Sequence, residues 1–448
     1  MTVLADLRAF VAVDASTWRR RLMLVMVFVL PLHTVFLSQW ISWKPFLILL
    51  LAIAVFDLAA GWAARRWPWH VPATIALGLF LVLVSASWTD AGYPVRFSRL
   101  LLALGVGGMV MLVVERGLRE PDSTGPVLRT VFWSAAALGV SAIVFAIVGV
   151  GALGSGAIDA FNDIPGVFRI FKPAYLTEGF VAVTNWHQDP GYSAAWMNLW
   201  AALALVAAIR RFGSGRWWAD GAVIGALGLG TFMTMSRTGW VGFAAGLVAA
   251  AAILAIKDRV ALRPLAERLI AGALVFVVLL GIVAVVDRPD IGSDLDQAVA
   301  FRLDQRLTLD AGDAGELGES EGVVDARSVV WPQYVDAFLD NPLRGIGLGT
   351  GWATPDMQEP HNLALELLGE TGLLGLAGFI VLFGVVVYFG RGTVGAIALT
   401  VALIAAFTQT VLFEPTWWFA AGLYLGRAGI DRTRMVAQES AISSRLIS

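Results

Sequence analysis

Residues 269–286 read LIAGALVFVVLLGIVAVV, a stretch that contains no charged side chain. An α-helix of this length spans about 27 Å, close to the ~30 Å hydrocarbon core of a bilayer. Hydrocarbon offers no hydrogen-bond partner to an exposed backbone, so such a segment is stable in a membrane only when it is helical. The stretch therefore predicts a membrane-spanning helix.

Similar apolar segments recur along the whole 448-residue chain. Hydrophobic residues make up 58% of it and charged residues only 15%, a composition that excludes an ordinary water-soluble globular protein. We predict an all-α, polytopic membrane protein with about 12 transmembrane helices. The predicted spans are 22–37, 46–64, 72–88, 99–114, 127–150, 191–209, 217–235, 238–256, 268–286, 361–389, 393–412 and 414–427.

The distribution of basic residues predicts the orientation of these spans. With the N-terminus in the cytoplasm, about two thirds of the 32 lysines and arginines fall in inner connections, beginning with Arg19, Arg20 and Arg21. No small-residue cleavage site follows these arginines, so we expect the first helix to be retained. Both chain ends are expected on the cytoplasmic side.

Charge and cysteine content narrow the functional classes. The formal net charge is -2 and no long basic tract is present, so nothing in the sequence favours nucleic-acid binding. The chain has no cysteine, which excludes disulfides, thiolate metal sites and a cysteine nucleophile.

The predicted spans divide the chain into four parts. Residues 1–286 are expected to form spans one to nine, with an aromatic-rich periplasmic loop at 151–190. Residues 287–360 are expected to form a long periplasmic loop. Residues 361–427 are expected to form the last three spans, and residues 428–448 a cytoplasmic tail.

The long loop has a mixed composition. It contains nearly half of the 34 acidic residues, and we expect an ordered helix near 325–340. The glycine-rich run 345–351 is similar to a phosphate-binding loop, but no βαβ unit surrounds it, so we interpret it as the approach to the next helix. Asp294 and Asp296 have the same spacing as the paired aspartates of metal-dependent glycosyltransferases. Those enzymes use cytoplasmic sugar nucleotides, so we interpret these two acids as solvated charge.

Arg237 is the first candidate functional residue. It lies in the outer turn between two spans, where it is the only fully charged residue. An arginine at the membrane interface can extend its guanidinium into water at little cost, so a purely interfacial role is one interpretation. Binding of an anionic group is the other.

His361 and Asn362 open a predicted span that contains Glu366 and Glu370. Asn362, Glu366 and Glu370 are four residues apart and are expected to form one stripe of the helix, facing a polar interior. Histidine can accept a proton near neutral pH, as transfer to a hydroxyl group requires. A histidine at a helix start can equally be a capping or interfacial residue.

Three further polar residues have simpler interpretations. Asp189 and Pro190 have the residue types of a helix N-cap and first turn at the start of the sixth span. Asp57 in the second span and His33 in the first are interpreted as paired structural groups.

Three blocks of sequence, in this order, resemble the O-antigen ligase and O-antigen polymerase superfamily of bacterial envelope enzymes. They are Ser236-Arg237 in the outer turn, Arg327 to Trp331 followed by Asn341 to Gly349, and His361 to Gly375. The similar region covers roughly residues 210–412. Asp189 to Tyr192 resembles a further segment of the family, although Gly191 stands where the family usually has asparagine.

The resemblance implies an enzyme that transfers a glycan from undecaprenyl diphosphate to an acceptor hydroxyl. By matching position, Arg237 and Arg327 would hold the diphosphate, and His361 would activate the acceptor or contact the leaving group. We expect Arg237 and His361 to be catalytic, and Arg327, Asn362 and Glu370 to bind substrate. Guanidinium groups can stabilise the charge of a departing diphosphate, so no metal or other cofactor is expected.

The full hypothesis is a metal-independent, inverting glycosyltransferase in the bacterial inner membrane with its active face in the periplasm. Its expected partners are the lipid-linked glycan donor, a glycolipid or glycan acceptor and membrane lipid. An O-antigen ligase acting on lipid A core is the first candidate, and a polysaccharide polymerase is the alternative. A secondary transporter is the rival from another class, favoured by Asp57, Glu366 and Glu370.

Overall fold

The computed structural model describes residues 2–31, 45–120, 122–147, 190–286, 326–351, 360–407, 409 and 411–426. In these ranges the regular structure is entirely helical. The predictions for His33, Asp189, Asp294 and Asp296 lie outside the described residues. Most of the loops at 151–190 and 287–360 and the tail at 428–448 also lie outside them.

The described residues of the N-terminal part form nine long helices and one short 3₁₀ helix. They are α1 (Thr2–Val29), α2 (Pro45–Ala63), α3 (Val71–Ser85), η1 (Ala86–Asp90), α4 (Pro94–Leu118), α5 (Thr124–Ile147), α7 (Pro190–Ile209), α8 (Trp217–Met233), α9 (Arg237–Lys257) and α10 (Leu262–Val286).

The C-terminal part begins with a helix outside the bundle and returns to it. Its elements are α12 (Ala326–Asp340), α13 (Leu363–Glu366), the π-helical turn η6 (Leu367–Thr371), α14 (Gly372–Phe389), α15 (Thr393–Ala406), the 3₁₀ turn η7 (Val411–Phe413) and α16 (Pro415–Leu425). The helix that the sequence predicts near 325–340 is therefore confirmed.

Eight helical segments of the described residues are long and apolar enough to cross a membrane. They are Pro45–Ala63, Val71–Asp90, Pro94–Leu118, Thr124–Ile147, Gly191–Ile209, Arg237–Lys257, Leu262–Val285 and Leu363–Phe389. The chain is thus a polytopic all-α membrane protein. Each of the twelve predicted spans contains a helix, but α8, α15 and α16 are shorter and α1 carries several charges, so the count of twelve stays a prediction.

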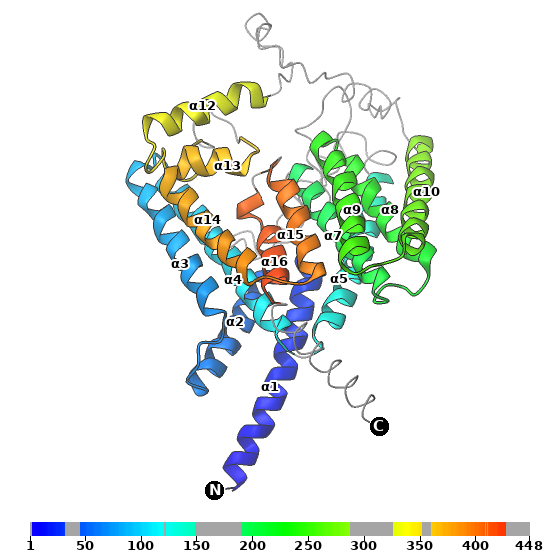
Figure 1. Ribbon diagram of the computed structural model, residues 1–448, viewed down its shortest axis with the longest axis horizontal. Helices are drawn as coiled ribbons and strands as arrows, with labels where there is room; N and C mark the ends of the chain where they lie inside the picture. The colour runs from blue at the N-terminus through cyan, green and yellow to red at the C-terminus, as the bar shows by residue number, and fades with distance from the viewer. Residues whose placement is uncertain are drawn as a thin grey trace, which may run out of the picture.

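The central helix of the bundle is α7. Nearly all of its residues are buried, and it packs against α5, α8, α9 and α15. In Figure 1, α15 and α16 lie between a group that contains α3, α4 and α14 and a group that contains α8, α9 and α10. A helix that is apolar on all sides is expected at the centre of a membrane bundle.

Helices α8 and α10 pack closely because small residues face each other. A Cβ atom added at Gly225 of α8 would lie 2.4 Å from the carbonyl oxygen of Gly272 in α10. Lipid tails are as apolar as leucine side chains, so the hydrophobic effect does not drive two helices together within a membrane. Their association depends instead on van der Waals contacts, which such close packing increases.

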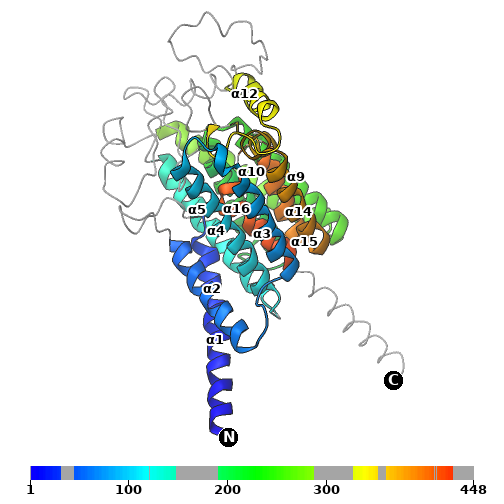
Figure 2. The same cartoon turned by 90° about the vertical axis from the view of Figure 1, so that its left-hand side faces the viewer.

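The two ends of the bundle differ. The helix α12 lies beyond one end, and α1 begins at the opposite end, in both Figure 1 and Figure 2. At the α12 end, Arg344 donates a hydrogen bond to Thr89 Oγ1 of η1 at 3.2 Å, so the turn after α12 is attached to the bundle. By the orientation that the basic residues predict, this is the outer end.

One prediction about the helix near His361 needs correction. The helix begins at Leu363, with Asn362 as its N-cap, and it is interrupted by the π-helical turn η6 before α14. Asn362 therefore lies outside the helix, and Asn362, Glu366 and Glu370 do not follow a single regular α-helical stripe. A π-turn holds one residue more per turn than the α-helix on which the stripe depends.

Candidate functional site

The helix α12 holds the segment that precedes His361. Trp331 Nε1 donates a hydrogen bond to the carbonyl oxygen of Pro360 at 2.9 Å. Tyr334, one turn further along, is fully buried, and its ring lies where a Cβ atom at either Gly351 or Gly369 would stand. The two glycines thus let α12 dock directly on the glycine-rich turn and on η6.

The turn 341–351 wraps around Glu370. The backbone N–H groups of Gly349 and Gly351 donate to the two carboxylate oxygens of Glu370, at 2.7 and 3.2 Å. The backbone also pairs with η6, since Ile346 N donates to Gly369 O at 3.0 Å and Gly347 N donates to Glu370 O at 2.9 Å. Two blocks of the family resemblance therefore form one structural unit.

Glycine is required in this turn for its backbone conformation. Gly345 has a φ of +68°, and a Cβ there would meet the Glu370 backbone at 2.4 Å. Residues with a side chain rarely adopt such positive φ values. The glycine-rich run thus serves to bring the backbone close to Glu370.

His361 stands between this unit and the end of α15. Its φ is +47°, an uncommon value for a residue with a side chain, and strained backbone of this kind is concentrated at functional sites. Its ring nitrogen Nδ1 lies 3.1 Å from Oε1 of Gln409. The histidine is partly exposed.

Asn362 caps the helix that follows. Its Oδ1 accepts hydrogen bonds from the backbone N–H groups of Ala364 and Leu365, at 3.0 and 3.1 Å. This cap fixes the backbone immediately after His361. Glu366, in the first turn, is buried, as is Glu370.

Arg237 is the first residue of α9. Ser236 is the N-cap of this helix, and its Oγ accepts a hydrogen bond from Gly239 N at 3.1 Å. Arg237 is partly exposed. The positive end of the helix dipole adds to the charge of the guanidinium, so the start of α9 favours an anionic ligand.

The first turns of α7 connect Arg237 with His361. Ala194 contacts Gly239, where an added Cβ would lie 2.5 Å from the Ala194 methyl group. Gly191, three residues before Ala194 and on the same face of α7, contacts the side chain of Gln409. The start of α9 and His361 therefore lie at the same end of the bundle, next to the first turns of α7.

A buried asparagine fixes the start of α9 against α7. Asn198 Nδ2 donates to the carbonyl oxygen of Gly239 at 3.1 Å, and its Oδ1 accepts from Thr231 Oγ1 of α8 at 3.3 Å. One side chain thus joins three helices below Arg237.

Arg327 lies in the first turn of α12, on the same end of the bundle. Only its backbone is among the described residues, so its prediction as a diphosphate ligand stays a prediction. The described residues contain no group of three or more histidine, aspartate or glutamate side chains arranged to hold a metal ion.

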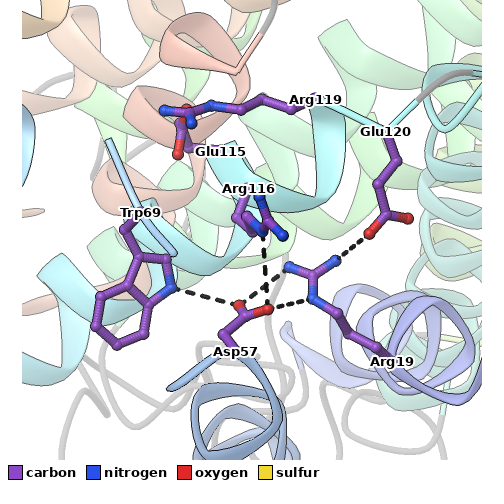
Figure 3. Close-up of polar contacts among 7 residues, drawn as sticks. All are labelled: Arg19, Asp57, Trp69, Glu115, Arg116, Arg119 and Glu120. Carbon is purple, nitrogen blue, oxygen red and sulfur yellow. Dashed lines mark hydrogen bonds and ion pairs between the residues drawn. The ribbon is translucent and has the colours of Figure 1, made fainter. Parts of the chain in front are cut away.

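A second polar cluster joins α1, α2 and α4 near the opposite end (Figure 3). Asp57 is almost fully buried and accepts hydrogen bonds from Arg19 Nε at 2.5 Å, Arg19 Nη2 at 3.1 Å and Trp69 Nε1 at 3.3 Å. Arg19 also donates to Glu120 at 2.9 Å. Asp57 is thus a paired structural group.

Two residues of the site could not be identified from their sequence context. Gln409 and Tyr334 belong to no recognisable motif. Each contributes to the site only through contacts with residues far away in the chain. The available signal for Gln409 was a polar side chain inside the predicted span 393–412.

A protein-family model matches part of the chain. Residues 221–380 match the family described as O-antigen ligase, and this range includes Arg237, α12, the turn around Glu370 and His361. Comparison with curated proteins gives no match.

Proposed function

We propose that the chain belongs to the O-antigen ligase and polymerase superfamily and that it transfers a glycan from undecaprenyl diphosphate to an acceptor hydroxyl. The match of residues 221–380 to the O-antigen ligase family supports this proposal. We assign it to the ligase type, with a sugar of the lipid A core as acceptor. The reaction takes place at the outer face of the bacterial inner membrane, where both lipid substrates meet.

The observation that carries this proposal is the position of Arg237 and His361 at one end of the bundle, next to the first turns of α7. A guanidinium is always charged and can donate two parallel hydrogen bonds to a phosphate, which suits a diphosphate leaving group. An imidazole at the same end of the bundle supplies the proton acceptor that a hydroxyl nucleophile needs. Each group therefore matches one half of the reaction.

The reaction is a single displacement at the sugar. The acceptor oxygen forms a bond to the anomeric carbon while its proton passes to Nε2 of His361. The bond between that carbon and the phosphate oxygen breaks, and its electron pair leaves with undecaprenyl diphosphate, whose growing charge Arg237 stabilises. Attack from the face opposite the leaving group inverts the configuration of the sugar carbon.

The other predicted site residues take separate roles. Arg327, at the start of α12, is proposed to bind the second phosphate. Asn362 holds the backbone beside His361 through its helix cap, and its amide nitrogen donates to the carbonyl oxygen of Phe407 at 3.5 Å. The burial of Glu370 and its hydrogen bonds to the turn favour a role in shaping the loop above the donor over direct contact with substrate.

The membrane topology follows from the same proposal. The chain has twelve spans, with both ends in the cytoplasm and residues 287–360 in the periplasm. Arg237, Arg327 and His361 then face the compartment where the flipped lipid-linked donor is found. The exposed outer surface around them receives the acceptor.

Arginines in place of a metal ion make the transfer independent of divalent cations. Activity of the purified protein is therefore expected to survive EDTA. If EDTA abolishes activity and Mg²⁺ or Mn²⁺ restores it, this part of the proposal is contradicted. That result would favour a metal site that includes Asp294 and Asp296.

The test of the proposed function is deletion of the gene, followed by gel analysis of lipopolysaccharide and exopolysaccharide. A ligase predicts free core together with accumulated carrier-linked polymer. Core capped by a single repeat unit would instead identify a polymerase. Unchanged glycans would exclude both and favour the transporter hypothesis.

A further inference from the structure

We propose that Gln409 is a positioning residue, which holds His361 in the tautomer that can accept a proton, and that Gly191 provides the space for it. This inference rests on the proposed glycosyl transfer. It concerns a contact between two residues that are 48 positions apart in the chain.

The hydrogen bond between the two side chains determines the tautomer. Gln409 Oε1 lies 3.1 Å from His361 Nδ1, and an amide oxygen can only accept a hydrogen bond. The proton of the neutral imidazole therefore resides on Nδ1. The other ring nitrogen, Nε2, is then the unprotonated one, and an unprotonated imidazole nitrogen is the form that accepts a proton.

The surroundings of Gln409 fix its side chain in this position. Its backbone N–H donates to the carbonyl oxygen of Ala405 at 2.8 Å, which continues the last turn of α15. The residue is buried, so its amide is held by protein rather than by bulk water. The backbone of His361 is itself fixed on both sides, by the bond from Trp331 to Pro360 and by the Asn362 cap.

Gly191 leaves room for the amide of Gln409. A Cβ atom at position 191 would lie 1.9 Å from Gln409 Nε2 and 2.5 Å from Gln409 Cδ. Such an atom cannot coexist with the observed amide position. The amide is the end of a flexible side chain, so it can move aside while α7 keeps its place. A methyl group at position 191 is thus expected to break the contact with His361 without unfolding the helix.

The kinetic test compares four variants of the full-length protein in lipid nanodiscs. Gln409→Leu and Gly191→Ala are each expected to lower kcat about tenfold or more, with little change in KM for the donor, because oriented acid–base groups contribute factors of this size or larger. The double variant Gly191→Ala/Gln409→Leu is expected to be no slower than Gln409→Leu alone. Gln409→Glu retains an acceptor oxygen and is expected to restore most of the lost rate.

The control for the glycine substitution is Gly384→Ala in α14. A Cβ atom there has no neighbour within 4 Å, so this change adds the same methyl group without displacing anything. Its kcat is expected to equal that of the unchanged protein.

A spectroscopic test is independent of activity. The chain has four histidines, so ¹⁵N-histidine labelling gives few signals, and His361→Gln identifies the one from His361. The unchanged protein is expected to show a protonated Nδ1 and an unprotonated Nε2 in neutral His361. Gln409→Leu and Gly191→Ala are expected to show a mixture of the two tautomers.

The outcomes separate the two proposals. If His361→Ala abolishes transfer while Gln409→Leu and Gly191→Ala keep full kcat and the same ¹⁵N signals, the positioning role is overturned and the proposed function stands. If Gln409→Leu lowers kcat but leaves the tautomer unchanged, the positioning role is also overturned. If the unchanged protein has no transferase activity, the proposed function fails, and the ¹⁵N signals alone decide whether Gln409 fixes the tautomer.

Discussion

The carboxylate of Glu370 accepts a hydrogen bond from the backbone N–H of Gly349 at 2.7 Å, although the two residues are 21 positions apart. The carboxylate is fully buried, and its other oxygen accepts from Gly351. One side chain of the membrane bundle thus holds the turn 341–351 in place.

Glu370→Ala is expected to destabilise this turn. The substitution leaves two buried N–H groups without their acceptor, and each such group costs about 1–3 kcal/mol. Thermal unfolding in detergent should occur at lower temperature, and transfer should fall because α12 and Pro360 lose their support. Glu370→Gln keeps one acceptor oxygen and is expected to be milder. Equal stability of Glu370→Ala and the unchanged protein would contradict the structural role.

Arg237→Ala is expected to abolish glycan transfer while the protein still inserts and folds. Removal of one charge-stabilising donor costs about 10²–10³ in kcat in comparable sites. Arg237→Lys keeps the charge but loses the two-pronged geometry, so partial activity is expected.

The matched control for Arg237 is Arg263→Ala. Arg263 lies at the opposite end of the bundle, its side chain is 89% exposed, and it pairs with Glu267 on the surface of α10. Exposed pairs of this kind contribute little to stability, so the control should retain full activity. Full transfer by Arg237→Ala in carrier-linked glycan assays would remove its diphosphate role.

His361→Ala is expected to reduce turnover more than donor binding. The imidazole acts on the acceptor hydroxyl, and general base catalysis contributes about 10²–10⁴ in rate. Measurement of kcat and of donor affinity in the same preparation separates the two effects. An unchanged kcat would contradict the catalytic role of His361 and leave it only a structural role before the helix.

Asp57→Ala is expected to destabilise the protein without a specific effect on transfer. Removal of one partner of a buried ion pair leaves the other charge uncompensated, at a cost of about 3–5 kcal/mol. The cluster around Arg19 joins α1, α2 and α4 at the end opposite His361 (Figure 3). The folded fraction should keep its specific activity, and a selective loss of transfer at full stability would contradict this assignment.

The sequence predicted the elements whose signals are local. The helix near 325–340 is present as Ala326–Asp340, and the start of α7 lies at Pro190, as its residue types indicated. The hairpin around Arg237 was also located correctly, because two apolar runs are separated there by a few polar residues. Apolar length and turn residues act over short distances, so a single sequence is enough to read them.

The contacts that build the site could not be predicted in this way. The pairing of Glu370 with Gly349, and of His361 with Gln409, depends on how distant segments pack. The π-helical turn after Glu366 has no simple periodic signal in the sequence. Because of this turn, Asn362, Glu366 and Glu370 do not share the single helix face that was expected. Gly191 could be recognised as a departure from the family, but the side chain that fills its space became apparent only in three dimensions.

The most direct measurement is the sidedness of the Arg237 turn, because the lipid-linked donor is proposed to be on the outer face. The chain has no cysteine, so single substitutions give unambiguous labelling. Thr238→Cys beside Arg237, and Thr89→Cys at the same end, are expected to react with a membrane-impermeant maleimide in intact spheroplasts. Ala261→Cys, in the turn between α9 and α10, should react only after the membrane is permeabilised. Labelling of Ala261→Cys but not of Thr238→Cys in intact spheroplasts would place Arg237 in the cytoplasm and contradict the proposed chemistry.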